Sequence, residues 1–263
     1  MFLDLDSQKI FALSFGAGSR TFLAHGGWIS NFEDWIDVVA LLSGSWRAVV
    51  YDHRGAGESR VPADLITAES LVDDVFRVMD AMQIDRCILG GFSRGTATVL
   101  RAAVLHPERF EGLVLLNGHG EVRDPVLPVP ARVPPSKWPG ATHEEHLRWF
   151  IDRCTPESGV EHIRRWGMSI LGRSPADVAD RLFMVESLEK IDWPARLADF
   201  TVPTLLVHGQ KDAFFDVRNF QYLHSLLPVS KFIELEGSGH LPAMIRPVDV
   251  AREIQRYFEA EGV

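Results

Sequence analysis

The chain has 263 residues, of which 46% are hydrophobic and 24% charged, and this composition is that of an ordinary globular protein. The length is enough for one large core, and α/β chains of this size often form a single domain. The formal net charge is −9 and the sequence has no cluster of Lys and Arg, which disfavours a nucleic-acid partner.

Short apolar segments alternate with amphipathic helical patterns until Asn117. This alternation is typical of βαβ units, so we expect an α/β fold with a mostly parallel central sheet and flanking helices. Strands are expected at residues 2–4, 10–15, 21–24, 46–51, 86–90 and 112–116, and helices at 69–82, at 96–105 and after the capping residue Asn31.

The alternation stops after Asn117, where six prolines crowd residues 125–139. Helical patterns follow, and no further strand is expected before residue 203. We therefore expect a helical lid of residues 120–198, inserted after the sixth strand into an α/β core of residues 1–119 and 199–263. The lid helices are expected at 144–154, 160–171 and 176–187, and the core resumes with strands at 203–207 and 231–235 and helices at 217–227 and 248–258.

The cysteines and the N-terminal residues bear on the compartment. Cys87 and Cys154 are too few for a disulfide framework, and Cys87 lies in an apolar run that favours burial. Residues 1–6 lack the basic region and apolar stretch of a signal peptide. No apolar run approaches the roughly 18 residues that cross a bilayer. We expect a cytoplasmic protein without a membrane partner.

A candidate nucleophile lies between an expected strand and an expected helix. The run Gly91-Phe92-Ser93-Arg94-Gly95 matches G-x-S-x-G, and at a strand–helix junction this turn exposes the serine hydroxyl. Glycines are needed on both sides because a Cβ would collide with the neighbouring strand and helix. The alternative interpretation is a glycine-rich turn that binds phosphate.

A serine nucleophile needs a base, and the base needs an acid that orients it. Asp212 and His240 each follow an expected strand. Because the carboxyl ends of parallel strands meet at one edge of the sheet, Ser93, Asp212 and His240 should converge there. Asp216 is the alternative acid, but its place just before the next helix favours a capping role.

Several other histidines are expected to be structural. His106 precedes a proline and His208 ends a strand. His143 and His146 flank two glutamates, but their spacing is one residue short of the zinc-binding H-E-x-x-H pattern. A solvated helix face is expected there, and the sequence predicts neither a metal site nor another cofactor.

Four motifs in chain order resemble those of the α/β-hydrolase family and together cover almost the whole chain. They are the oxyanion turn His25-Gly26-Gly27-Trp28, the D-x-R-G-x-G-x-S loop from Asp52 to Ser59, the elbow at Ser93, and the acid and base loops. The resemblance implies an oxyanion hole made of the backbone N–H groups of Gly27 and Arg94. Each such donor contributes about 3–4 kcal/mol to the stabilisation of the transition state.

The register of the oxyanion turn favours Gly27 over Trp28 as the donor. Trp28 is expected to line the pocket, and His25 to pack under the turn. Arg94 departs from the family, in which Met, Leu or Gln usually follows the nucleophile. A charge beside an active site must be paired, so a buried salt bridge is expected. The alternative is that the Arg94 guanidinium binds an anionic group of the substrate.

The serine at the elbow narrows the reaction. Related haloalkane dehalogenases and epoxide hydrolases use an aspartate there, and epoxide opening also needs lid tyrosines, which the expected lid lacks. We expect a carboxylesterase that cleaves a small or medium apolar ester through an acyl-enzyme, as a monomer or homodimer. The expected pocket residues are Trp28, Phe92, Trp138, Trp149, Trp166, Phe183 and Leu241.

The resemblance leaves other activities open. A lactonase, a C–C bond hydrolase and a proline-iminopeptidase-like enzyme share the same scaffold and triad, and a perhydrolase or haloperoxidase side reaction is compatible with it. The alternative outside catalysis is a ligand receptor on the same fold. Such receptors often lose a triad residue, whereas all three are present here.

Overall fold

The central sheet is mostly parallel, as predicted. This computed structural model describes residues 1–5, 8–129 and 131–260, and these residues form an eight-stranded sheet with the order β1-β2-β4-β3-β5-β6-β7-β8. β2 pairs antiparallel with β1 and β4, and the remaining pairs are parallel. The strands are β1 (Phe2–Leu5), β2 (Gln8–Phe15), β3 (Thr21–His25), β4 (Arg47–Tyr51), β5 (Cys87–Phe92), β6 (Phe110–Leu116), β7 (Thr204–Gly209) and β8 (Ser230–Leu235).

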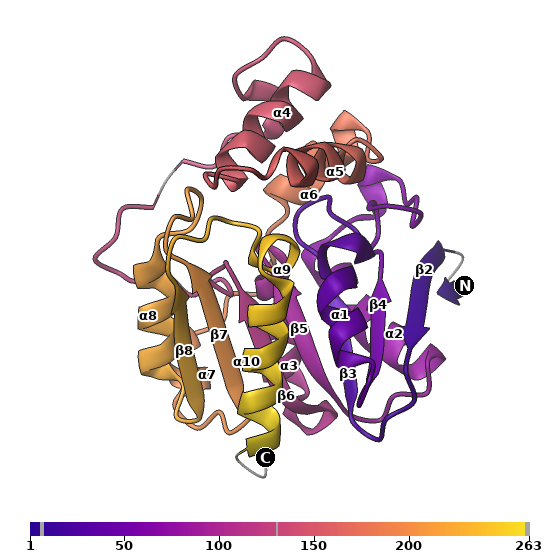
Figure 1. Ribbon diagram of the computed structural model, residues 1–263, viewed down its shortest axis with the longest axis vertical. Helices are drawn as coiled ribbons and strands as arrows, with labels where there is room; N and C mark the ends of the chain where they lie inside the picture. Colours follow the sequence, from indigo (N-terminus) through magenta and orange to yellow (C-terminus); the bar gives the residue numbers. More distant parts are fainter. Residues whose placement is uncertain (6–7, 130, 261–263) are drawn as a thin grey trace.

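Helices cover both faces of this sheet. α1 (Ile36–Leu42) packs against α10 (Pro247–Ala260) on one face, and α2 (Ala68–Ala81) packs against α3 (Gly95–Leu105) on the other (Figure 1). β3 and β5 are therefore buried along their whole length, which explains their largely apolar sequences. The core also contains α8 (Val217–Leu226), α9 (Pro242–Ile245) and the 3-10 helices Phe32–Trp35, Ala63–Leu65 and Pro107–Arg109.

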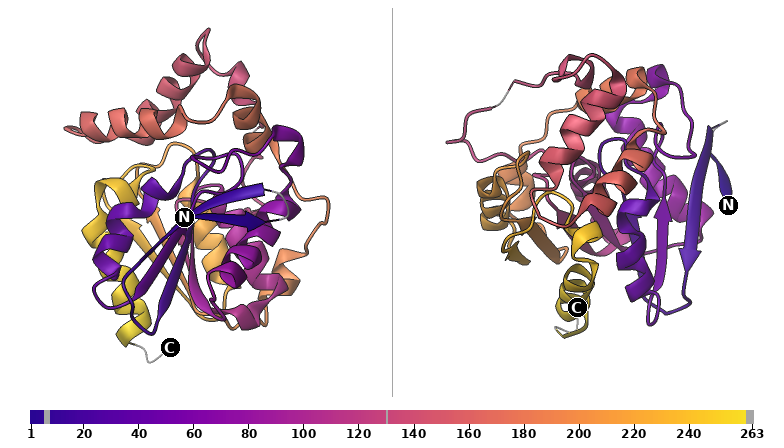
Figure 2. Two further views of the ribbon diagram at one scale, coloured as in Figure 1. Left: turned by 90° about the vertical axis from the view of Figure 1, so that its right-hand side faces the viewer. Right: turned by 45° about the horizontal axis from the view of Figure 1, so that its top comes forward.

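Between β6 and β7 the chain leaves the sheet. Three helices from this stretch lie beyond the end of the sheet at which α9 begins (Figure 1, Figure 2). They are α4 (His143–Cys154), α5 (Glu161–Leu171) and α6 (Ala176–Met184), and the 3-10 helix Pro135–Lys137 precedes them. The predicted lid also includes α7 (Trp193–Leu197), but this helix contacts the core, where Arg196 donates a hydrogen bond of 3.1 Å to the carbonyl of Val104 in α3.

The predicted fold class is confirmed, with differences at short elements. The helix expected after Asn31 starts as a 3-10 turn, in which the Asn31 side chain accepts the N–H of Glu33 at 3.0 Å, and α1 begins only at Ile36. α7 and α9 were not expected because four or five residues are too few to show apolar periodicity. The division into core and lid stays a prediction, and its ranges include residues 6–7, 130 and 261–263, which lie outside the described residues.

Two further observations concern the cysteines and the helices. Cys87 and Cys154 are both free and buried, so the packing role expected for Cys87 agrees with its position in β5. Among the described residues, no helix combines the length and the apolarity that crossing a membrane requires.

Candidate active site

Ser93 occupies a strained turn between β5 and α3. Its φ angle is +53°, in the left-handed region that side chains rarely adopt. A Cβ on Gly91 would lie 2.7 Å from the side chain of Val99, and one on Gly95 would lie 2.2 Å from the carbonyl oxygen of Gly26. Glycine is therefore required on both sides of Ser93, as the G-x-S-x-G motif predicts.

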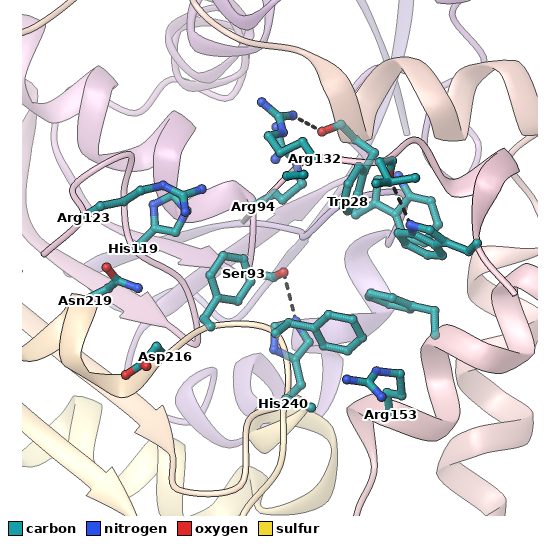
Figure 3. A pocket seen from close by; sticks show the side chains of 18 of the residues that line it. Trp28, Ser93, Arg94, His119, Arg123, Arg132, Arg153, Asp216, Asn219 and His240 are labelled. Carbon is teal, nitrogen blue, oxygen red and sulfur yellow. Dashed lines mark hydrogen bonds between the residues drawn. The ribbon is translucent and has the colours of Figure 1, made fainter. Parts of the chain in front are cut away.

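The structure brings Ser93, His240 and Asp212 together. Ser93 Oγ lies 3.0 Å from His240 Nε2, and His240 Nδ1 lies 2.8 Å from Asp212 Oδ2 (Figure 3 shows the first of these contacts). The Ser93 residue is 4% exposed, and the side chains of His240 and Asp212 are 1% and 0% exposed. These are hydrogen-bond distances suited to proton transfer between serine and histidine, and all three side chains are buried.

The two candidate acids have different surroundings. Asp212 Oδ1 accepts the backbone N–H groups of Phe214 and Phe215 at 2.8 and 3.1 Å, while Oδ2 faces His240. Asp216 instead caps α8, where it accepts the N–H of Arg218 at 3.0 Å. Asp216 is thus engaged at the helix terminus, and Asp212 is the carboxylate in contact with His240.

Asn117, at the carboxyl end of β6, is a site residue that the sequence did not reveal. It has a φ angle of +44° and is fully buried. Its Nδ2 donates to Asp212 Oδ2 at 2.8 Å and to the carbonyl of Gly239 at 3.0 Å, and its Oδ1 accepts the N–H of Gly209 at 3.2 Å. One amide therefore ties the acid loop to the base loop.

The turn after β3 is supported by two stacked histidines. The His25 and His53 rings lie 5.0 Å apart, and His53 Nε2 donates to the carbonyl of Gly27 at 2.8 Å. Burial, together with the charge of His53, lowers the pKa of His25 to about 3, and burial also lowers the pKa of His53. Both rings are neutral at physiological pH and hold the turn.

The backbone N–H groups of the predicted oxyanion donors differ in whether they already donate a hydrogen bond. Gly27 lies against the nucleophile, since a Cβ there would be 3.2 Å from Ser93 Cβ. Its N–H, however, already donates to Ser30 Oγ at 2.6 Å. Among the described residues, the N–H groups of Arg94 and Trp28 have no acceptor. The donor expected at Gly27 is thus covered by a hydroxyl in this structure.

Comparisons with known proteins agree with the fold of the chain. A family model described as alpha/beta hydrolase fold matches residues 20–138. The solved enol-lactonase of Burkholderia xenovorans LB400 superposes with a TM-score of 0.84 at 20% identity, covering 98% of this chain and all of the other (100%). The chain has the α/β-hydrolase fold.

Two further similar proteins are hydrolases by name. The 3-oxoadipate enol-lactonase 1 of Acinetobacter baylyi is 25% identical over 215 residues, which are 81% of this chain and 79% of that protein. The esterase of Thermogutta terrifontis has a TM-score of 0.77 at 24% identity, covering 96% of this chain and 94% of the other.

The Asp212 carboxyl is held in its ionised form. Burial alone would raise the pKa of Asp212, but the charge of His240 and the hydrogen bond from it outweigh burial, and the pKa lies below its usual value. Asp212 is therefore charged throughout the neutral range and can stabilise a protonated His240.

A cavity of about 740 Å³ opens over Ser93 and His240. Of the expected pocket residues, Trp28, Trp138, Trp149 and Phe183 line it. Phe92 and Leu241 line a separate void of about 30 Å³ that also touches Ser93 and His240. Trp166 lines neither space, because its Nε1 donates to Glu33 Oε2 at 2.6 Å. The cavity residues that were not expected include Phe150, Phe214, Phe215, His119, Arg123 and Arg132.

Arg94 does not form the expected buried salt bridge. Its side chain donates to the carbonyls of Leu182 at 3.2 Å and Val185 at 2.9 Å, at the end of α6. No carboxylate among the described residues lies within ion-pair distance of it. The neutral carbonyls of the helix end satisfy its hydrogen bonds but not its charge.

His143 and His146 also differ from expectation. His146 is buried, and its Nε2 lies 3.2 Å from the carbonyl of Gly140. His143 is half-buried, and its Nε2 lies 3.1 Å from the carbonyl of Ser174. The prediction of a solvated helix face is wrong for this pair, because each ring binds a backbone carbonyl outside α4.

Proposed function

We propose that the chain is a serine hydrolase that cleaves a small or medium carboxylic ester through an acyl-enzyme. Ser93 is the nucleophile, His240 the general base and Asp212 the acid that orients it. The contacts Ser93 Oγ–His240 Nε2 and His240 Nδ1–Asp212 Oδ2, at 3.0 and 2.8 Å, are the observation that carries this proposal. The residues between β6 and β7, mainly α4 to α6, form the lid over this site.

The reaction follows from these contacts. Ser93 gives its proton to His240 Nε2 as Ser93 Oγ attacks the ester carbonyl carbon, and Asp212 stabilises the imidazolium. His240 then gives the proton to the alcohol oxygen, the C–O bond breaks, and the acyl group stays on Ser93. Water that loses a proton to His240 attacks this acyl-enzyme, and release of the acid restores the Ser93 hydroxyl.

The oxyanion needs two donors, and we assign them to Arg94 and Gly27. The Arg94 N–H has no acceptor among the described residues, which supports its role. The Gly27 N–H becomes available when the substrate oxygen replaces Ser30 Oγ, and Trp28 is the alternative donor on the same turn. Each donor would contribute about 3–4 kcal/mol.

The cavity supports an apolar ester of modest size. A volume of about 740 Å³ lies in the range of small-molecule sites, and indole and phenyl rings form much of the wall. A lactone would react by the same steps, and the enol-lactonase relatives at 20–25% identity favour it as a second candidate.

Turnover of a substrate panel tests the proposal. The panel contains p-nitrophenyl esters from acetate to octanoate, five- and six-membered lactones, and prolyl and other aminoacyl naphthylamides. We expect the short and medium esters to be cleaved, with kcat falling by at least about 1,000-fold in Ser93→Ala. The variant Ser225→Ala, on the exposed side of α8, is the matched control and should keep full activity.

The outcomes separate the alternatives. A higher kcat/KM for lactones than for esters would assign a lactonase, and cleavage confined to the naphthylamides would assign an aminopeptidase. Binding of these compounds without turnover would favour a receptor. Ester cleavage that is equal in Ser93→Ala and in the unmodified protein would overturn the proposal.

A further inference from the structure

The cavity over Ser93 is basic although the chain as a whole is acidic. Among the described residues, six basic side chains and one carboxylate line the cavity, whereas the chain has 36 acidic and 27 basic residues. The carboxylate is Asp216, which is held by Arg218 at 2.6 Å. The basic side chains are those of Arg94, Arg123, Arg132, Lys137, Arg153 and Arg218.

Most of these cations already pair with a carboxylate or are exposed to water. Arg218 pairs with Asp216, and Arg132 pairs with Glu186. Lys137 and Arg153 are exposed to water. Two half-buried cations remain, Arg94 and Arg123, and neither has a carboxylate within ion-pair distance among the described residues.

Arg94 and Arg123 line the same cavity as Ser93. Arg94 follows Ser93 directly in the chain, and Figure 3 shows Arg123 beside His119 across the cavity from His240. Both arginines and His119 also line the adjoining cavity of about 340 Å³, which reaches Ser93 as well. An anion bound by them would thus lie in the cavity that contains Ser93.

The surroundings of these groups leave positive charge unsatisfied. Burial, and then the charge of Arg132, lowers the pKa of Arg94 to about 9, and nearby Glu121 and Glu186 offset this only in part. Burial and the charge of Arg123 lower the pKa of His119 to about 3, so its ring is neutral. The buried His119 Nδ1 has no hydrogen-bond partner among the described residues. No carboxylate among the described residues compensates the charge of Arg94 or Arg123, and an anionic ligand would supply that compensation.

We propose that Arg94 and Arg123 form a carboxylate-binding subsite beside Ser93, so that the preferred ester carries a second carboxylate on one of its arms. The proposal rests on the hydrolase function above and names its substrate class. Guanidinium groups bind carboxylates through paired, charge-assisted hydrogen bonds, which suit this ligand better than a neutral ester arm. The aromatic wall around Trp28, Trp138 and Phe183 would receive the other arm.

A pair of matched esters tests the subsite. Monophenyl glutarate carries the carboxylate on its acyl arm, and phenyl methyl glutarate has the same length without the charge. We expect kcat/KM for phenol release to favour the charged ester by about 10-fold or more, as a charge-assisted hydrogen bond would give. Raising the ionic strength to 1 M should reduce this preference.

Arg123→Gln is the informative variant because the Arg123 side chain has no hydrogen bond to the rest of the described chain. We expect it to lower the charged-to-neutral ratio of kcat/KM by about 10-fold. Arg148→Gln makes the same charge change on the exposed surface of α4, where Arg148 pairs with Glu144, and should leave the ratio unchanged.

A second ester pair tests whether the subsite binds a carboxylate on the alcohol arm of the ester. 4-Carboxyphenyl acetate and its methyl ester carry or lack the carboxylate on the alcohol side. A preference for the charged member of either pair that Arg123→Gln removes supports the subsite and shows which arm it binds. If neither pair shows a preference, or if Arg123→Gln retains it, the subsite proposal is wrong.

Binding separates this proposal from the hydrolase function. Calorimetric titration of Ser93→Ala with glutarate needs no turnover, and methyl butyrate serves as the uncharged control. Glutarate binding that is lost in Ser93→Ala/Arg123→Gln supports the subsite even if no ester is cleaved. Ester turnover without charge preference and without glutarate binding would overturn the subsite and leave the hydrolase function standing.

Discussion

Asn117 donates its amide to the same carboxylate oxygen of Asp212 that faces His240, and both contacts are 2.8 Å long. The second Asn117 contact, to the Gly239 carbonyl, lies one residue before His240. Asn117 therefore fixes the orientation of the carboxylate relative to the imidazole. In the proposed mechanism it is a positioning residue, since it contacts Asp212 and is not among the described residues that line the cavity over Ser93.

Asn117→Gly should lower kcat. Glycine accepts the φ angle of +44° without strain, so the variant removes the amide while leaving the backbone free to keep its turn. A hydrogen bond to a charged group contributes about 1.5–3 kcal/mol, so kcat should fall by about 10- to 100-fold. KM should change by no more than about 3-fold, because the substrate does not contact this residue. An unchanged kcat would mean that Asp212 does not need the hydrogen bond from Asn117.

Asp212→Asn and Asp216→Asn form a matched pair. The first should reduce kcat by about 10,000-fold, because an amide cannot stabilise the imidazolium and can hold the wrong tautomer of His240. The second should change kcat by no more than about 2-fold, since asparagine also caps helices well. Steady-state kinetics on a p-nitrophenyl ester measures both. A large loss in Asp216→Asn alone would reverse the assignment of the acid.

The elements around the site could be predicted because local sequence determines them. The left-handed turn at Ser93 requires glycines within two residues, and Asp212 and His240 come directly after apolar strands. The capping role of Asp216 follows from its place before α8. In each case the informative residues lie close together in the chain.

Contacts between distant segments could not be predicted in the same way. Asn117 has no motif of its own, and its role depends on backbone groups 92 and 122 residues away. Three of the cavity cations, Arg123, Arg132 and Lys137, come from the proline-rich segment after β6, whose path no periodicity describes. Trp166 was expected in the pocket, but the rotation of α5 turns its indole toward Glu33. The Arg94 side chain likewise donates to a carbonyl of α6 and not to a carboxylate, and this contact joins segments that lie far apart in the sequence.

Gly95→Ala should destabilise the protein and disturb the oxyanion turn. The new Cβ would lie 2.2 Å from the Gly26 carbonyl oxygen and 2.8 Å from His25 Nδ1, and neither neighbour can move freely. The clash should lower the free energy of unfolding by about 1–3 kcal/mol, beyond the roughly 1 kcal/mol that alanine gains in a helix. Urea unfolding measures the effect.

Gly44→Ala is the control for this substitution. A Cβ at Gly44 would meet nothing within 4 Å, so the stability should stay the same or rise by about 0.5 kcal/mol. Equal urea midpoints for the two variants would contradict the close approach of α3 to the oxyanion turn.

Asp34 should make stability depend on pH. This carboxyl lines the small void beside Ser93, is 4% exposed, and its Oδ2 has no partner among the described residues. Burial raises its pKa to about 7, although hydrogen bonds from Ser30 and from the Gly27 backbone oppose the rise. Between about pH 4 and pH 7 the unfolded chain ionises this group and the folded chain does not, so stability is lost as the pH rises through that window.

Asp34→Asn should remove that loss. Asparagine has nearly the same shape and stays neutral, so the variant should gain stability relative to the unmodified protein as the pH rises from 4 to 7, by an amount on the order of a few kcal/mol. Denaturant unfolding at pH 5 and pH 7.5 measures the gain. Asp37→Asn, on the exposed side of α1, controls for the loss of one carboxylate and should show no such gain. A stability difference between Asp34→Asn and the unmodified protein that is the same at both pH values would show that Asp34 is ionised in the folded state.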